Sequence, residues 1–111
     1  MQTIVELPEY LKKADKLLSN SERISVINYL AAHPLSGDLM QGAGGIRKLR
    51  WSAHGKGKSG GVRIIYYQHN KSIPLFLLTL FGKGEKSNLT KSERNELAKL
   101  MPLLAKNYGG E

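Results

Sequence analysis

The sequence lacks cysteine entirely, and it has no acidic residue between Asp38 and Glu85. Without cysteine there are no disulfides, no thiolate catalysis and few options for structural zinc, and the redox compartment stays undetermined. No run of about 18 apolar residues occurs, so no segment resembles a membrane-spanning helix. Residues 1–13 carry acids early and lack the apolar run of a signal peptide. We therefore expect a cytoplasmic protein.

The length and composition are those of one folded domain. The chain has 111 residues, of which 41% are hydrophobic and 23% are charged. Both fractions are ordinary for a globular protein, and the length is near the commonest domain size. We expect a single domain over residues 1–111, with one modest core.

The basic charge is concentrated in the middle of the chain. The net charge is +8, yet residues 1–38 hold four basic and five acidic side chains and residues 85–111 hold five and four. A local excess of one sign costs self-repulsion, and a polyanionic partner is a common reason to keep it. A solvated face kept for solubility is the alternative. An anionic membrane is less favoured, because the basic residues do not fall on an amphipathic helix.

The first part of the chain predicts a strand and two helices. Weak alternation predicts a short strand over 3–7. A proline at the first helical position favours a helix over 8–18. Ser19 and Glu22 have the spacing of a capping box, which predicts a second helix to about residue 32, where a following proline stops it.

The second part predicts a loop, three strands and a helix. The composition of residues 34–45 indicates a loop, and three antiparallel strands follow over 46–51, 62–68 and 73–81. A capping box and an apolar stripe predict a final helix, which Pro102 should kink or split. This order is typical of an α+β domain with a small antiparallel sheet of three to four strands. We expect the helices on one face and the basic side chains on the other.

Metal and nucleotide sites are poorly supported. The three histidines, His33, His54 and His69, lack ligand spacing and read better as exposed or loop-packed residues. The glycine-rich stretch GKGKSGG lacks the GxxxxGK[ST] spacing and precedes a strand rather than a helix. We expect no cofactor and no metal.

Basic residues are then the available chemical groups. RNA is cut without metal when its 2′-hydroxyl attacks the adjacent phosphate, which needs a base, positive charge on the phosphate and an acid. Arginine suits the phosphate role through its fork of donors. Four aromatic residues flank the basic segment and are candidates for base stacking, although two or three of them should be core. They are Trp51, Tyr66, Tyr67 and Phe81.

Three motifs follow one another between residues 38 and 88: QGAGGIRKLR, GKGKSGGVRIIYY and LFGKGE. Their succession closely resembles the HigB-like branch of the RelE/ParE superfamily of bacterial type II toxin–antitoxin toxins, over roughly residues 20–105. The resemblance implies a toxin that enters the ribosomal decoding site and cuts mRNA there as a metal-independent endoribonuclease. It also implies a RelE-like α+β fold, a cognate antitoxin of the helix-turn-helix, HigA-like kind, and no membrane partner.

The resemblance implies a role for each matched residue. Arg63 opens the VRIIYY strand and matches the catalytic arginine, which would contact the scissile phosphate. Lys56 and Lys58 match the basic loop before it, with phosphate binding as their task. Lys48 and Arg50 project from the neighbouring strand and would contact the substrate or ribosomal RNA.

The GKGEKS loop would close the site. It holds Lys83, Glu85 and Lys86, and Glu85 would accept a proton or orient Lys83. The better-known RelE pattern has an arginine and then a tyrosine in and after this loop, where this chain has Gly84 and Thr90. Either a different group is the base, or the chain is a weak nuclease.

Two other functional classes remain open from the sequence. ParE-type toxins share this architecture and poison DNA gyrase without cutting nucleic acid. A plain nucleic-acid-binding module without chemistry is the third reading. Dense cationic clustering around Arg63 and Lys83 favours the nuclease, because a gyrase inhibitor has no need of it.

Overall fold

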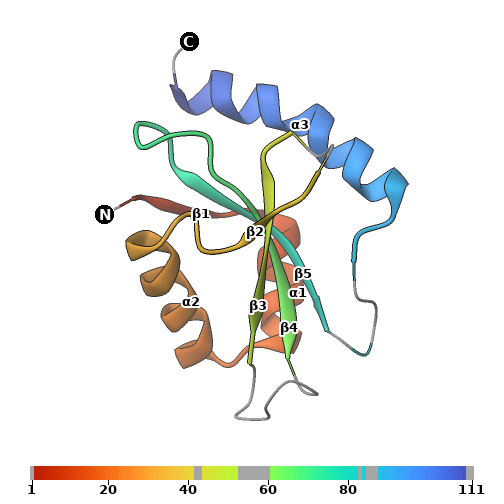
Figure 1. Ribbon diagram of the computed structural model, residues 1–111. Helices are drawn as coiled ribbons and strands as arrows, with labels where there is room; N and C mark the ends of the chain where they lie inside the picture. The colour runs from red at the N-terminus through yellow and green to blue at the C-terminus, as the bar shows by residue number, and fades with distance from the viewer. Residues whose placement is uncertain (1, 42–43, 53–60, 83, 85–87, 110–111) are drawn as a thin grey trace.

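The computed structural model describes residues 2–41, 44–52, 61–82, 84 and 88–109. Figure 1 shows the elements in chain order. They are β1 (Ile4–Glu6), α1 (Pro8–Leu17), α2 (Asn20–Ala32), β2 (Asp38–Leu39), β3 (Ile46–Trp51), β4 (Val62–Tyr67), β5 (Leu75–Gly82) and α3 (Lys91–Gly109). The α+β class is confirmed. The strand β2 lies where the composition predicted only a loop.

The sheet has five strands and is mixed. Its order is β1-β5-β4-β3-β2, with β1 parallel to β5 and the other pairs antiparallel. The prediction of a purely antiparallel sheet of three to four strands was therefore wrong in these two respects. The chain leaves β1 through two helices and returns to the same sheet, and such a crossover connection permits a parallel pair.

The capping box that begins α2 is confirmed. The Ser19 amide donates to Glu22 Oε1 at 2.7 Å, and the Glu22 amide donates to Ser19 Oγ at 3.2 Å. These bonds satisfy helix-start amides that have no partner within the helix. Arg23, one turn further on, lies 3.1 Å from Glu6 Oε2 and ties the helix to β1.

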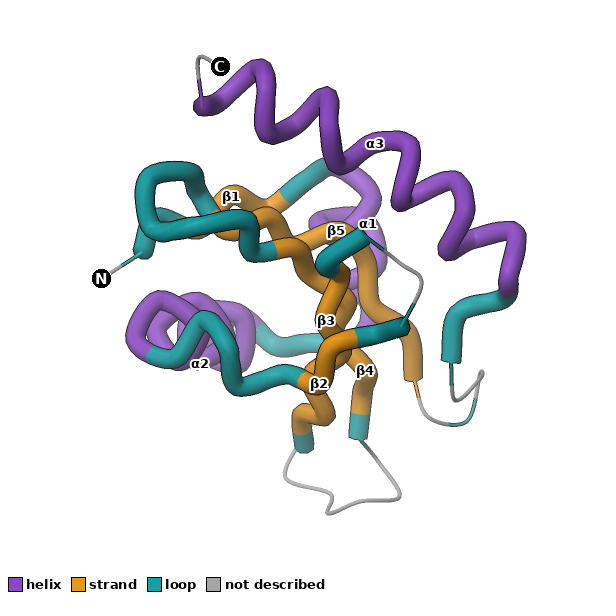
Figure 2. Tube along the Cα trace, turned by 45° about the horizontal axis from the view of Figure 1, so that its top comes forward, coloured by secondary structure: helices purple, strands orange, loops and turns teal. Residues whose placement is uncertain are grey.

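The two faces of the sheet carry separate cores. One core joins α1 and α2 to the sheet through residues such as Ala14, Leu30 and Ile64. The other joins α3 to the opposite face through residues such as Met101 and Phe76. Figure 2 shows the strands between α2 on one side and α3 on the other. The prediction that all helices share one face was wrong, since α3 has its own apolar stripe to bury.

Helix α3 continues through Pro102 to Gly109, so the helix is not split. A proline in a helix interior costs about 3 kcal/mol. Met101 and Leu104 are both more than nine-tenths buried, and such burial contributes about 1.5–3 kcal/mol per side chain. Packing against the sheet therefore outweighs the cost of the proline. Within the described residues, no helix combines the length and apolar character needed to cross a membrane.

Candidate nucleic-acid interface

Alternation along β3 places two of its cations, Lys48 and Arg50, on the face opposite Leu49 and Trp51. Leu49 and Trp51 pack against the core beneath α1 and α2, as predicted. Lys48 and Arg50 have the opposite parity and lie on the α3 face, because successive strand residues point to opposite faces. The basic residues thus lie opposite the N-terminal helices, and they share their face with α3.

Arg63 on β4 belongs to the same face. It pairs with Arg50 across β3 and with Phe81 across β5. Directly opposite residues of antiparallel strands have Cβ atoms about 4.5–5.5 Å apart, so two like charges here are destabilising. The sheet therefore holds two arginines side by side in spite of their repulsion.

Arg63 is also buried, with only 8% of its surface exposed. Ion pairs within the described residues join Lys13 to Glu9 and Arg23 to Glu6, and none involves Arg63 or Arg50. No hydrogen bond joins the Arg63 guanidinium to another described side chain. A buried cation without a counter-charge is costly unless a ligand supplies one. An anion bound beside Arg63 would supply such a counter-charge.

A basic groove lies beside Arg50, with a volume of about 230 Å³. Its described lining comes from β2 and the residues after it, from β3, from the segment before α3, and from the first turn of α3. It consists of Asp38, Leu39, Met40, Gln41, Lys48, Arg50, Asn88 and Arg94. We call this set the basic groove. Three of its residues are cationic, and Arg94 and Asn88 were not expected from the sequence.

Arg47 belongs to the basic segment but not to the groove. Its Nη1 donates to the carbonyl of Gly37 at 2.8 Å and to that of Leu35 at 3.3 Å. The Tyr66 hydroxyl, opposite Arg47 on the same face, donates to the Pro34 carbonyl and accepts from the Gly37 amide, both at 2.9 Å. Arg47 is therefore a structural cation that fixes residues 34–37, which lead into β2.

Gly37 makes the closest approach in this loop. A Cβ at this position would lie 2.8 Å from a Tyr66 ring carbon and 3.1 Å from the Lys48 carbonyl oxygen. No side chain fits at such distances without a backbone shift. The glycine thus allows the loop to lie against β3 and β4, and it sets the position of Asp38.

The flanking aromatic residues are mostly core. Tyr66 and Phe81 are fully buried and Tyr67 is 5% exposed. Burial raises the pKa of the Tyr66 hydroxyl and of the Tyr67 hydroxyl above the ordinary value. Trp51 packs edge-on against Tyr29, with ring centroids 5.7 Å apart, on the face of the N-terminal helices. None of the four presents a free ring to the basic groove, so base stacking on them is not supported.

The described histidines are exposed, as we expected from their spacing. His33 and His69 are exposed, and the His69 Nδ1 lies 2.7 Å from the Tyr67 hydroxyl oxygen. Among the residues that the structure describes, no three potential metal ligands gather in one place. His54 lies outside the described residues.

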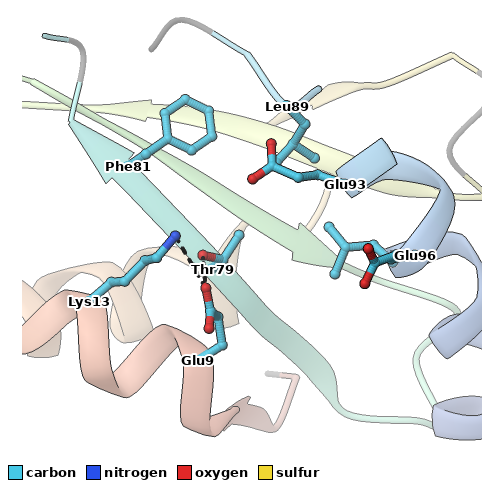
Figure 3. Close-up of a pocket in the computed structure, with 8 residues that line it drawn as sticks. Glu9, Lys13, Thr79, Phe81, Leu89, Glu93 and Glu96 are labelled. Atoms are coloured by element: carbon cyan, nitrogen blue, oxygen red, sulfur yellow. Dashed lines mark hydrogen bonds and ion pairs between the residues drawn. The ribbon is translucent and has the colours of Figure 1, made fainter. Parts of the chain in front are cut away.

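A second cavity of about 250 Å³ lies between α1 and α3, beside the end of β5. Figure 3 shows Glu9 and Lys13 of α1 across the gap from Glu93 and Glu96 of α3, with Thr79 and Phe81 on the strand between them. Lys13 Nζ lies 3.2 Å from Glu9 Oε2. The lining includes these six residues with Leu89 and Leu97. We call this cavity the acidic pocket; its charge does not suit a phosphate.

Five predicted site residues lie outside the described residues: Lys56, Lys58, Lys83, Glu85 and Lys86. The structure does fix where the neighbouring strands end. Trp51 pairs with Val62, and Val62 pairs with Gly82, so three strand ends meet next to Arg63. The predictions for the five residues remain predictions.

The geometry describes a small basic α+β protein whose sheet carries Lys48, Arg50 and Arg63 on the face that it shares with α3. Residues 10–108 match the family model of the RelE toxin of the RelE / RelB toxin–antitoxin system. The match covers most of the chain. The protein therefore belongs to the RelE toxin family.

Proposed function

We propose that the protein is a HigB-like, ribosome-dependent endoribonuclease that cleaves mRNA in the decoding site and so inhibits translation. The observation that carries this proposal is the buried Arg63, which faces Arg50 across the sheet and has no acidic partner among the described residues. Family membership supports a toxin of this general kind. A phosphate would supply the missing counter-charge.

The proposed reaction needs no metal. The 2′-hydroxyl gives its proton to a base, its oxygen attacks the neighbouring phosphorus, and the bond from phosphorus to the 5′-oxygen breaks as that oxygen takes a proton. The products are a 2′,3′-cyclic phosphate and a 5′-hydroxyl. Arg63 would neutralise the charge that develops on the pentacovalent phosphate, a role in which a preorganised donor is effective.

The other residues have supporting roles in this proposal. Lys48 and Arg50 would bind RNA next to the scissile phosphate. Lys56 and Lys58 would bind phosphate, and the loop with Lys83, Glu85 and Lys86 would close the site. Glu85 would orient Lys83 or accept the 2′-proton.

A cognate antitoxin is the expected protein partner. It would be a HigA-like helix-turn-helix protein with an acidic segment, because the face that it must block carries Lys48, Arg50 and Arg63. RelE family membership supports an antitoxin in general. Its HigA-like character is part of the proposal.

The test compares Arg63→Ala and Arg63→Lys with wild type. mRNA ends are mapped with and without ribosomes, and growth inhibition is scored in a bacterium. We expect Arg63→Ala to lose at least about 100-fold in cleavage, as when one oxyanion donor is removed. Arg63→Lys should also lose most of the cleavage activity, because an ammonium group cannot present two parallel donors to a phosphate. Lys12→Ala, an exposed α1 residue on the other face, is the charge-matched control and should cut normally.

The outcomes separate the alternatives. A folded Arg63→Ala variant that still cuts would contradict the proposed role. Growth inhibition without RNA cleavage, together with inhibition of DNA gyrase, would identify a ParE-like toxin. Salt-sensitive RNA binding with neither effect would leave a non-catalytic binding module.

A further inference from the structure

The basic groove contains one acidic residue among the described residues that line it. Asp38 lies directly opposite Lys48 in the β2–β3 pair, and both side chains line the groove. A carboxylate in a site for RNA repels phosphate, so its presence costs binding unless it meets a different part of the nucleotide. The base is that part, since bases carry N–H donors.

The position of Asp38 is fixed by the residues before it. Gly37 is held by two hydrogen bonds, in which its amide donates to the Tyr66 hydroxyl and its carbonyl accepts from Arg47 Nη1, and a Cβ added to it would collide with the Tyr66 ring. The register with Lys48 fixes Asp38 itself. A side chain on a backbone held in this way loses little further freedom on binding, which is the condition for selective recognition.

The groove has the size for the base of one nucleotide and donors for its phosphates. Its volume of about 230 Å³ is below the roughly 300–1,000 Å³ of pockets that enclose drug-sized ligands, so the base would enter and the phosphates would stay at the rim. Lys48 lines it from β3 and Arg94 from α3, and we expect them to bind the two flanking phosphates. Leu39 and Met40 add apolar surface for the base.

A carboxylate distinguishes the four bases by their Watson–Crick edges. Guanine presents two adjacent N–H donors, at N1 and N2, which match the two carboxylate oxygens. Adenine and cytosine each present an amino group beside a ring acceptor. Uracil presents one N–H between two carbonyl oxygens, which repel a carboxylate. Single-stranded RNA is usually read on these edges.

We propose that the basic groove is a subsite for one unpaired nucleotide of the RNA substrate, in which Arg94 and Lys48 bind the phosphates and Asp38 selects guanine. This inference rests on the proposed function, because it assumes that RNA is the substrate. It adds a specificity residue, Asp38, and a binding residue, Arg94, to the site around Arg63.

The test measures binding and cleavage separately. Fluorescence anisotropy gives the affinity of the full chain for the pentanucleotides UUGUU, UUAUU, UUCUU and UUUUU. We expect the guanine oligonucleotide to bind about tenfold more tightly than the uracil one, the discrimination of one good bidentate pair. Asp38→Asn should bring the two within about twofold of each other. Asp15→Asn, an exposed carboxylate change on α1, should keep the wild-type ratio.

The cleavage arm uses ribosomes programmed with mRNAs that differ in one nucleotide of the decoding codon. Wild type should favour cuts next to guanine, and Asp38→Asn should lose that bias while it still cuts. If wild type cuts but its base distribution is unchanged in Asp38→Asn, the inference is wrong and Asp38 merely faces Lys48. If wild type binds guanine RNA selectively but never cuts, the proposed function fails and the subsite stands. If all four oligonucleotides bind equally, the inference is overturned.

Discussion

The basic groove and the acidic pocket have similar volumes and opposite charge, and the start of α3 contributes to both. Arg94 and Asn88 line the basic groove, whereas Leu89, Glu93 and Glu96 line the acidic pocket. Successive helix residues point about 100° apart, so the neighbours Glu93 and Arg94 face different cavities. The net charge of +8 is thus not spread evenly over the surface. The positions of the charged residues in the fold make one cavity basic, which suits a phosphate, and the other acidic.

The two cavities also differ in whether the charges beside them have partners of opposite sign. In the acidic pocket Lys13 lies beside Glu9, which itself accepts a hydrogen bond from the Thr79 hydroxyl at 3.4 Å. On the basic side, Arg50 and Arg63 face each other, and neither has an ion pair within the described part of the chain. Two like charges that face each other repel, and an anion bound between them would relieve that repulsion.

The largest effect on this comparison should come from Arg50→Glu. This substitution replaces the pair of arginines by an ion pair between Arg63 and the new carboxylate, so two phosphate-facing charges are lost. RNA affinity should therefore fall by at least tenfold. The slope of log affinity against log salt concentration should become less steep by about 1.4. The free energy of unfolding should rise, by about 0.2–1 kcal/mol, because the like-charge pair is relieved.

Salt-dependent RNA binding and chemical denaturation measure these two quantities. Lys12→Glu, with the same charge change on the opposite face, is the control and should leave the salt slope near that of wild type. If Arg50→Glu lowers stability and binds RNA normally, the cross-strand arginine pair is not a phosphate site.

Gly37→Ala should disturb the groove through the backbone. The added methyl would meet the Tyr66 ring, so we expect a loss of about 1–3 kcal/mol in unfolding free energy, typical of overpacking. RNA binding by the folded fraction should weaken because β2 shifts. Gly84→Ala, with open space around the added Cβ, is the matched control. Equal stability of the two variants would show that the loop tolerates a side chain.

Alkaline pH should release the same loop. Burial raises the pKa of Tyr66 in the folded state above its value of about 10 in the unfolded state. The neutral hydroxyl therefore contributes its full stability below about pH 10. This contribution is lost as the pH rises through the folded-state pKa. Tyr66→Phe should be about 1–3 kcal/mol less stable at neutral pH, because it leaves the Gly37 amide unsatisfied, and it should lose less stability above pH 10. Denaturation at several pH values measures both effects, and parallel pH profiles for the two proteins would contradict this role.

A smaller effect is expected from Arg94→Ala. Loss of one phosphate contact to single-stranded RNA should make the salt slope less steep by about 0.7. The matched control is Lys99→Ala, an exposed residue of the same helix outside the groove lining. Identical slopes for the two variants would remove Arg94 from the site.

The smallest effect should come from Glu96→Gln in the acidic pocket. Its side chain is exposed and lines the other cavity, so screening at physiological salt should keep the change in RNA affinity within about twofold. The same anisotropy titration measures it. A tenfold gain would mean that RNA also passes over the acidic pocket, and the two cavities would then form one continuous surface.

The sequence predicted those elements whose signals depend on neighbouring residues. The Ser19–Glu22 pair predicted the start of α2, and the alternation of IRKLRW predicted β3. The parallel pairing of β1 with β5 was missed because it joins residues about 70 positions apart. Strand β2 has two residues in a segment with loop composition, and only its partner on β3 makes it a strand. The split predicted at Pro102 does not occur, because the burial of its neighbours, a tertiary effect, stabilises the helix.

The candidate site shows the same division. Arg63, Lys48 and Arg50 could be assigned to one surface from strand parity. Arg47 has the other parity, and its role in holding residues 34–37 depends on backbone carbonyls that no sequence pattern reveals. Arg94 was missed because the helix was read only for its apolar stripe.

The most direct test of the central claim is a cryo-electron microscopy structure of the protein on a ribosome whose mRNA is 2′-O-methylated in the decoding codon, so that it cannot be cut. We predict that the Arg63 guanidinium contacts the phosphate next to the blocked 2′-oxygen, with Arg50 beside it and the neighbouring nucleotide in the basic groove. A complex in which mRNA follows another face of the protein and Arg63 contacts no phosphate would contradict the account.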